Sequence, residues 1–129
     1  MAESRVQRIM RWLLTGFFVV AGANHFVYPD AYRAMMPGAL PEPELLVLIS
    51  GVAEIAGGLG LTLPATRRLA AWGLIALLIA VFPANINMAI HRIPLGSRRL
   101  PDWALWGRLP LQIALIAWVY WFARPTPRR

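Results

Sequence analysis

Cysteine and lysine are both absent from the 129-residue sequence, and charged residues are scarce. Without cysteine, disulfide bonds, thiol redox chemistry and thiolate-bound metals or covalently attached cofactors are excluded within the chain. Charged residues make up only 15% of the sequence, whereas about 25% is usual for a soluble domain. Because 58% of the residues are hydrophobic, this shortfall indicates that lipid, rather than water, surrounds much of the protein.

The positive charge of the chain is carried entirely by arginine, and the formal net charge is +7. Such a balance would suit a nucleic-acid-binding protein, but the arrangement of the charges does not. The arginines lie between apolar blocks, at positions 5–11, 67–68 and 124–129, instead of along one polar face. Clusters of this kind flank membrane spans and fix their orientation. We therefore expect the lipid bilayer as a partner and no nucleic acid.

Four apolar runs predict transmembrane helices, at about residues 10–28, 45–63, 69–91 and 103–122. A proline-rich outer loop, 29–44, separates the first two runs and has room for a short helix lying in the membrane interface. Together the runs predict one domain over residues 1–129, an all-α integral membrane four-helix bundle. Pro83 and Pro110 fall inside the third and fourth runs, where proline removes a backbone donor and kinks a helix.

The arginine distribution also predicts an orientation. The N-terminus, the turn at 64–68 and the C-terminal tail, which ends in Arg128 and Arg129, hold most of the arginines and should be cytoplasmic. The loop at 29–44 is net acidic and should face outward. Arg92, Arg98 and Arg99 in the third connection argue the other way. An even number of spans with both termini in the cytoplasm fits the whole pattern best.

The first apolar run has an alternative interpretation as a cleavable secretory signal. Three arginines precede it, and Ala21-Gly22-Ala23 follows its apolar stretch as a small-residue cleavage site would. An uncleaved first span is the simpler interpretation, because three further apolar runs follow it.

Polar residues inside the apolar runs are costly in lipid and are therefore the candidates for a binding site. With a rise of about 1.5 Å per residue, all of them fall between the midplane and the outer face of the bilayer. The candidate pocket residues are Asn24, His25, Glu54, Asn85, Asn87, His91, Arg108 and Gln112. This asymmetry predicts a polar pocket that opens outward.

Glu54 is the strongest single candidate for a functional residue inside a span. A lone carboxylate at this depth costs about 2.5–3.5 kcal/mol on insertion scales, so it must be neutral or paired. Arg108 is the other charged residue well inside a span and is the expected partner, with Gln112 on the same helical face as Arg108. Such a pair either only fixes the register of the helices or binds a polar headgroup, a quinone carbonyl or a proton.

His25 and His91 are candidates for proton transfer or ligand binding, although a single histidine at such a depth is more often a hydrogen-bonded or interfacial residue. A metal site would need a third ligand, and Glu54 lies deeper than either histidine, so no metal is predicted. A haem held between the two histidines is an alternative that a helical bundle allows. Both histidines lie close to the water interface, which argues against it.

Four blocks carry more than a generic hydrophobic pattern: Gly16–Phe26, Ser50–Leu61, Val81–Ala89 and Arg108–Gln112. Together they resemble the DoxX-like family over nearly the whole chain, and the glutamate-glycine block and the Phe-Pro-Ala-Asn block are the most specific. The resemblance implies a four-helix, multi-pass protein of a bacterial inner membrane. Some members of that family are linked to redox systems, notably thiosulfate oxidation with quinone as the acceptor, but fold transfers between relatives better than activity does.

Two functional hypotheses follow. In the first, the protein is a redox-associated subunit that binds a quinone or another small hydrophobic ligand. A redox partner protein would then supply any flavin or nicotinamide, because the chain has no dinucleotide-binding glycine motif. In the second, it is a non-catalytic membrane scaffold or small carrier whose polar residues only fix helix packing. Whether it is an enzyme stays open, and its large lipid-facing surface also allows a homo-oligomer.

Overall fold

The computed structural model describes residues 3–36, 38, 40–94 and 99–124, and within these residues the structure is helical and contains no strand. The predicted all-α class is therefore confirmed. Three arginines of the predicted charge pattern, Arg98, Arg128 and Arg129, lie outside the described residues. The helices are α1 (Arg5–Val27), α2 (Pro29–Met35), α3 (Pro43–Gly60), α4 (Pro64–His91) and α5 (Asp102–Ala123).

Local sequence signals explain where the helices begin. Ser4 and Gln7 form a capping box at the start of α1, in which the Ser4 hydroxyl accepts from the Gln7 backbone amide and the Gln7 side chain accepts from the Ser4 amide. The helices α2, α3 and α4 each begin with proline. Proline is well tolerated there, because backbone N–H groups in the first turn have no acceptor within the helix. Both α4 and α5 continue through an internal proline.

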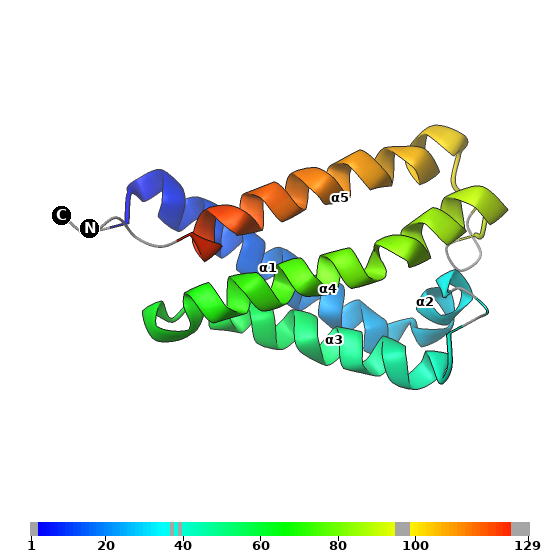
Figure 1. Ribbon diagram of the computed structural model, residues 1–129, viewed down its shortest axis with the longest axis horizontal. Helices are drawn as coiled ribbons and strands as arrows, with labels where there is room; N and C mark the ends of the chain where they lie inside the picture. Colours follow the sequence, from blue (N-terminus) through cyan, green and yellow to red (C-terminus); the bar gives the residue numbers. More distant parts are fainter. Residues whose placement is uncertain (1–2, 37, 39, 95–98, 125–129) are drawn as a thin grey trace.

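The four long helices lie roughly along one axis, and the short α2 lies at one end (Figure 1). Helix α1 packs on α3, α3 packs on α4, and α4 packs on α5, while α2 touches α1, α3 and α4. The start of α1, the α3–α4 turn and the end of α5 lie together at the opposite end from α2 (Figure 1). We call this the basic end, because its arginines are Arg5, Arg8, Arg11, Arg67, Arg68 and Arg124.

Glycines allow α1 and α3 to approach each other very closely. A methyl group added at Gly22 would lie 2.7 Å from the Gly51 carbonyl oxygen, and one added at Gly51 would lie 2.9 Å from the His25 Cβ. Neither position has room for a side chain. The backbones of the two helices are therefore in direct contact, which is how small residues act between membrane helices.

Two apolar clusters fill the interior. The larger lies toward the basic end and consists of Leu14, Phe18, Leu61, Ala71, Leu74, Ile75, Leu78, Val119, Phe122 and Ala123. The smaller lies near α2 and consists of Ala84, Met88, Ala89 and Leu105. The candidate site lies between them.

Within the described residues, two helices are long and apolar enough to cross a membrane, judged by length and composition alone: α3 and α4. Only 17% of the apolar window of α3 and 28% of that of α4 is buried inside the protein. An apolar helix in the core of a soluble protein is hydrophobic all round because it is buried. Most of the apolar surface of α3 and α4 instead faces outward.

Candidate functional site

A cavity of about 770 Å³ lies among all five helices and is bordered by both apolar clusters. Most of its lining is apolar, contributed by side chains such as Phe18, Leu78 and Leu115. Its polar lining residues are His25, Tyr32, Ser50, Glu54, Asn85, Arg108, Gln112 and Trp118. An apolar hollow with a few converging polar groups is the usual form of a small-molecule site.

The most informative polar contact joins His25 of α1 to Glu54 of α3. His25 Nδ1 lies 3.0 Å from the carbonyl oxygen of Val47, and its Nε2 lies 3.2 Å from Glu54 Oε2. The two side chains are buried, with 7% and 9% of each residue exposed. Within the described residues Glu54 Oε2 meets no well-aligned hydrogen-bond donor, so this oxygen keeps capacity for a further one.

The Val47 contact determines where the histidine holds its proton. A carbonyl oxygen only accepts, so Nδ1 must carry the hydrogen that it donates to Val47. In the neutral ring Nε2 then has a lone pair facing the carboxylate, which is favourable only if a proton lies on one of the two groups. The geometry therefore allows the pair to hold one transferable proton between the ring and the carboxyl group.

Helix α2 covers this pair. The rings of His25 and Tyr32 stack with their centroids 4.0 Å apart. The Asn24 side chain lies beside the Tyr32 hydroxyl, and burial raises the pKa of that hydroxyl. Tyr32 thus keeps its proton and remains a hydrogen-bond donor beside the cavity.

The opposite wall is a hydrogen-bonded group between α4 and α5. Asn85 donates to Gln112, and Gln112 donates in turn to the carbonyl oxygen of Leu78. The Arg108 guanidinium lies 2.9 Å from the Met88 sulfur and 3.4 Å from the Asn85 side-chain oxygen. No described ion pair includes Arg108, so its charge faces the cavity without a carboxylate partner.

The predicted ion pair between Glu54 and Arg108 is not formed: within the described residues the ion-pair partner of Glu54 is His25. The reason lies in the packing order of the helices. Helix α3 lies between α1 and α4, whereas α5 packs on α4. Glu54 therefore meets α1, and Arg108 meets α4.

Five of the eight predicted site residues line the cavity, and three do not. Asn24 lies beside Tyr32 without lining the cavity, and Asn87 is half-buried outside the lining. His91 is exposed at the end of α4, where its Nδ1 lies 3.1 Å from the Asn87 carbonyl oxygen.

The haem alternative does not fit this geometry. Both ring nitrogens of His25 are engaged, by Val47 and by Glu54, and His91 lies outside the cavity. For metals in general, the described residues contain no group of three or more His, Asp or Glu side chains that could hold an ion.

Sequence reasoning missed three polar lining residues, Tyr32, Ser50 and Trp118. Ser50 was detectable, since it lies one helical turn before Glu54 on the same face. Trp118 shares a helical face with Leu111 and Leu115, which also line the cavity. Tyr32 gives no such signal, because its position depends on how the short α2 folds back over the pair.

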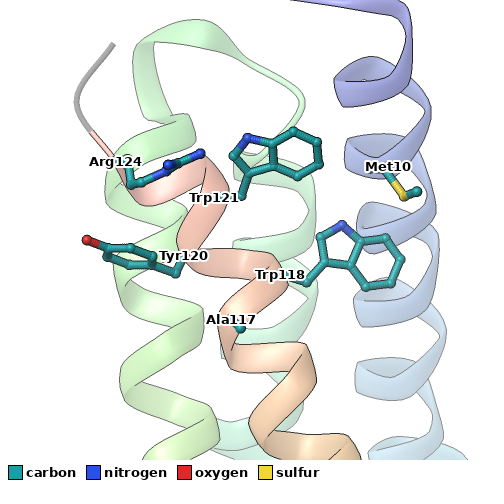
Figure 2. A pocket seen from close by; sticks show the side chains of 6 residues that line it. All are labelled: Met10, Ala117, Trp118, Tyr120, Trp121 and Arg124. Atoms are coloured by element: carbon teal, nitrogen blue, oxygen red, sulfur yellow. The ribbon is translucent and has the colours of Figure 1, made fainter. Parts of the chain in front are cut away.

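A second, shallower hollow of about 620 Å³ lies at the basic end and is shown in Figure 2. It is lined by Met10, Ala117, Trp118, Tyr120, Trp121 and Arg124. Figure 2 shows Trp118 pointing from α5 toward α1, where Met10 lies. Trp118 lines both hollows.

A family model described as a domain of unknown function (DUF8561) matches residues 14–123. That range includes every residue lining the central cavity except Leu13. Among curated proteins and solved structures, no match to the chain was found.

Proposed function

The chain belongs to the DUF8561 family, and on that premise we propose its function from the site: it binds a small hydrophobic ligand with an oxygen-bearing head, such as a quinone, inside a membrane. The observation that carries the proposal is the combination found in the cavity. The His25–Glu54 pair, which can hold a proton, lies on one side of a mostly apolar hollow. Arg108, which has no described carboxylate partner, lies on the other side.

The membrane location is supported by the surface. Large hydrophobic side chains are exposed on all four long helices, among them Phe17, Val52, Ile79 and Leu111 at 53%, 58%, 59% and 70%. In water, a contiguous apolar exterior of this kind would drive aggregation, whereas in lipid it is the expected exterior. We propose four spans, formed by α1, α3, α4 and α5.

The orientation follows from the charges. The basic end is proposed to face the cytoplasm and α2 the outside, because arginines collect on the cytoplasmic side of spans. On the DoxX-like resemblance, we propose that the protein is a multi-pass component of a bacterial inner membrane and a redox-associated subunit.

The ligand chemistry follows from the two polar walls. Arg108 is placed to donate to a carbonyl or other oxygen of a ligand head, and a guanidinium in an apolar setting donates strongly. The His25–Glu54 pair can give up or take back one proton at Nε2 or Oε2. Reduction of a quinone to a hydroquinone consumes two electrons and two protons. The pair would supply the first proton and would have to take up another from water before supplying the second, and the two electrons would come from the redox partner protein.

A non-catalytic scaffold is the second candidate. It is favoured by the hydrogen bonds of Gln112, which joins Asn85 to the Leu78 carbonyl and thereby ties α5 to α4 without any ligand. In that case the polar walls act only as links between helices.

The two candidates are separated by native mass spectrometry of the protein in mild detergent with a benzoquinone and a naphthoquinone added. We expect the wild type to retain quinone and Glu54→Gln to retain at least tenfold less, since the amide cannot share the proton with His25. Glu44→Gln is the matched control, because Glu44 is an exposed carboxylate on the same helix.

His25→Gln provides a second variant, and circular dichroism verifies that each variant is folded. If the wild type and both site variants retain the same amount of quinone, or if no protein retains any, the proposed function is contradicted. The non-catalytic scaffold would then be the better interpretation.

A further inference from the structure

We infer that the ligand reaches the cavity sideways, from the lipid, through a mouth between α1 and α5, and that it is an amphiphile with one long apolar chain. Its head lies between Glu54 and Arg108, and its chain extends through the mouth into the bilayer. This inference rests on the proposed function and replaces the outward opening expected from the sequence with a lateral one.

The end of the cavity beside α2 is closed by side chains. Tyr32 stacks on His25, and both Tyr32 and Met36 pack against the smaller apolar cluster of α4 and α5. A ligand arriving from the outer face would have to displace α2 together with these contacts.

The end toward the basic side is closed as well. Leu14, Phe18 and Val119 of the larger cluster are fully buried, with 0% exposed, and Trp118 packs against that cluster. Three of the four long sides are also shut by packed helix pairs. Gly22 and Gly51 seal α1 against α3, α4 packs on both α3 and α5, and a methyl group at Gly57 would lie 2.5 Å from a Leu74 side-chain carbon.

The remaining side, between α1 and α5, is different. Along their described residues these helices are not among the pairs that pack closely, and their ribbons run apart from the basic end toward α2 (Figure 1). Leu13, Phe17 and Leu111 line the cavity and are nevertheless 56%, 53% and 70% exposed. Residues that are both lining and exposed mark the place where the cavity meets the exterior.

The chemistry of this mouth selects what can pass. Its rim is apolar and lies in the middle of α1 and in the first half of α5, so it would open into the hydrocarbon region. A charged solute meets a large desolvation penalty there, whereas each buried CH₂ group contributes about 0.8 kcal/mol in favour of transfer from water to an apolar setting. A single chain attached to a polar head is therefore the ligand shape that fits both the mouth and the interior.

The test compares two probes on protein in lipid nanodiscs: a dimethoxy-methyl-benzoquinone with a decyl chain and the same quinone without a chain. Association is followed by quenching of tryptophan fluorescence, since Trp118 lines the cavity. Ala114→Phe narrows the mouth. Ala117→Phe is the control, an exposed alanine on the same helix that does not line this cavity, and Met36→Trp obstructs the α2 end.

We expect Ala114→Phe to slow association of the decyl quinone at least tenfold, while Ala117→Phe leaves the rate unchanged. Met36→Trp, at a lining residue on the closed α2 side, should slow association less than Ala114→Phe does. Leu111→Trp, also at the exposed rim, should act like Ala114→Phe. The quinone without a chain should bind at least tenfold more weakly to the wild type.

If Ala114→Phe and Leu111→Trp both bind the decyl quinone at the wild-type rate, the lateral route is wrong, although the proposed function still stands. If only Met36→Trp slows association, the ligand enters at the α2 end. Equal affinity for the two probes overturns the assignment of a chain-bearing ligand. If the wild type binds neither probe, the proposed function itself fails.

Discussion

Replacing Gly22 with alanine is expected to push α1 away from α3 and so to disrupt the contact between His25 and Glu54. The added methyl group would lie 2.7 Å from the Gly51 carbonyl oxygen and 2.7 Å from a side-chain carbon of Ile55. A side chain can rotate away, but a carbonyl oxygen of the backbone cannot move without its helix. The two helices therefore have to separate.

The size of the effect follows from two opposing contributions. Overpacking of a filled interface costs about 1–3 kcal/mol, and the backbone clash argues for the upper part of this range. Alanine in a helix is favoured over glycine by about 0.5–1 kcal/mol. Gly22→Ala should therefore destabilise the protein by about 1–2 kcal/mol. Gly16 is the matched control on the same helix, because an added methyl group there has no neighbour within 4 Å. Gly16→Ala should leave stability unchanged or raise it by up to about 1 kcal/mol.

The measurement is reversible unfolding in mixed detergent micelles, followed by circular dichroism, together with quinone retention. Gly22→Ala should unfold at a lower denaturant fraction than the wild type and retain less quinone, whereas Gly16→Ala should do neither. Equal stability of the two variants would refute the claim that backbone contact between α1 and α3 positions the site.

Three further predictions concern other contacts. Gln112→Leu leaves its Asn85 donor without a partner and should cost about 1–3 kcal/mol of unfolding free energy, measured by thermal unfolding in detergent; an unchanged melting temperature would show that this link between α4 and α5 is dispensable. Arg108→Gln removes the charged donor to the ligand head and should weaken quinone affinity at least tenfold in a titration, and wild-type affinity would exclude Arg108 from the site. The hydrogen bond from Arg11 lowers the pKa of the Glu3 carboxyl below its ordinary value of 4.5, so its stabilisation is complete above that value and is lost as the pH falls through the lowered pKa. The melting temperature of Glu3→Gln should accordingly depend less on pH below about 4.5 than that of the wild type, and parallel pH profiles would contradict this role.

The helices were predictable because their signals are local. Apolar runs bounded by proline, arginine and turn residues predicted the four long helices, and the glycines of 51–60 predicted close packing of α3. The inward direction of Glu54 was equally predictable, because an unpaired carboxylate on the apolar exterior of a predicted span would be too costly.

The pairing of the site residues was not predictable, because it depends on which helices are neighbours. Sequence spacing places Glu54 and Arg108 at similar depths but does not say that α3 and α5 are separated by α4. His91 shows the same limit in another form. It has the spacing of a residue facing inward, yet it is exposed, while Ile93 two residues later packs against the cluster around Met88.

The contact of α1 with α3 has a consequence for how this chain can change over generations. In the proposed membrane location, outward-facing leucine, isoleucine, valine and phenylalanine can replace one another, because lipid has no fixed shape. Any side chain at Gly22 or Gly51 would instead meet the neighbouring helix and force a shift. Overall identity between descendants should therefore decay quickly, while a few positions resist change. Distant relatives should be recognisable by two short signatures, glycine three residues before histidine in the first long helix and glycine three residues before glutamate in the second, as in Gly22–His25 and Gly51–Glu54.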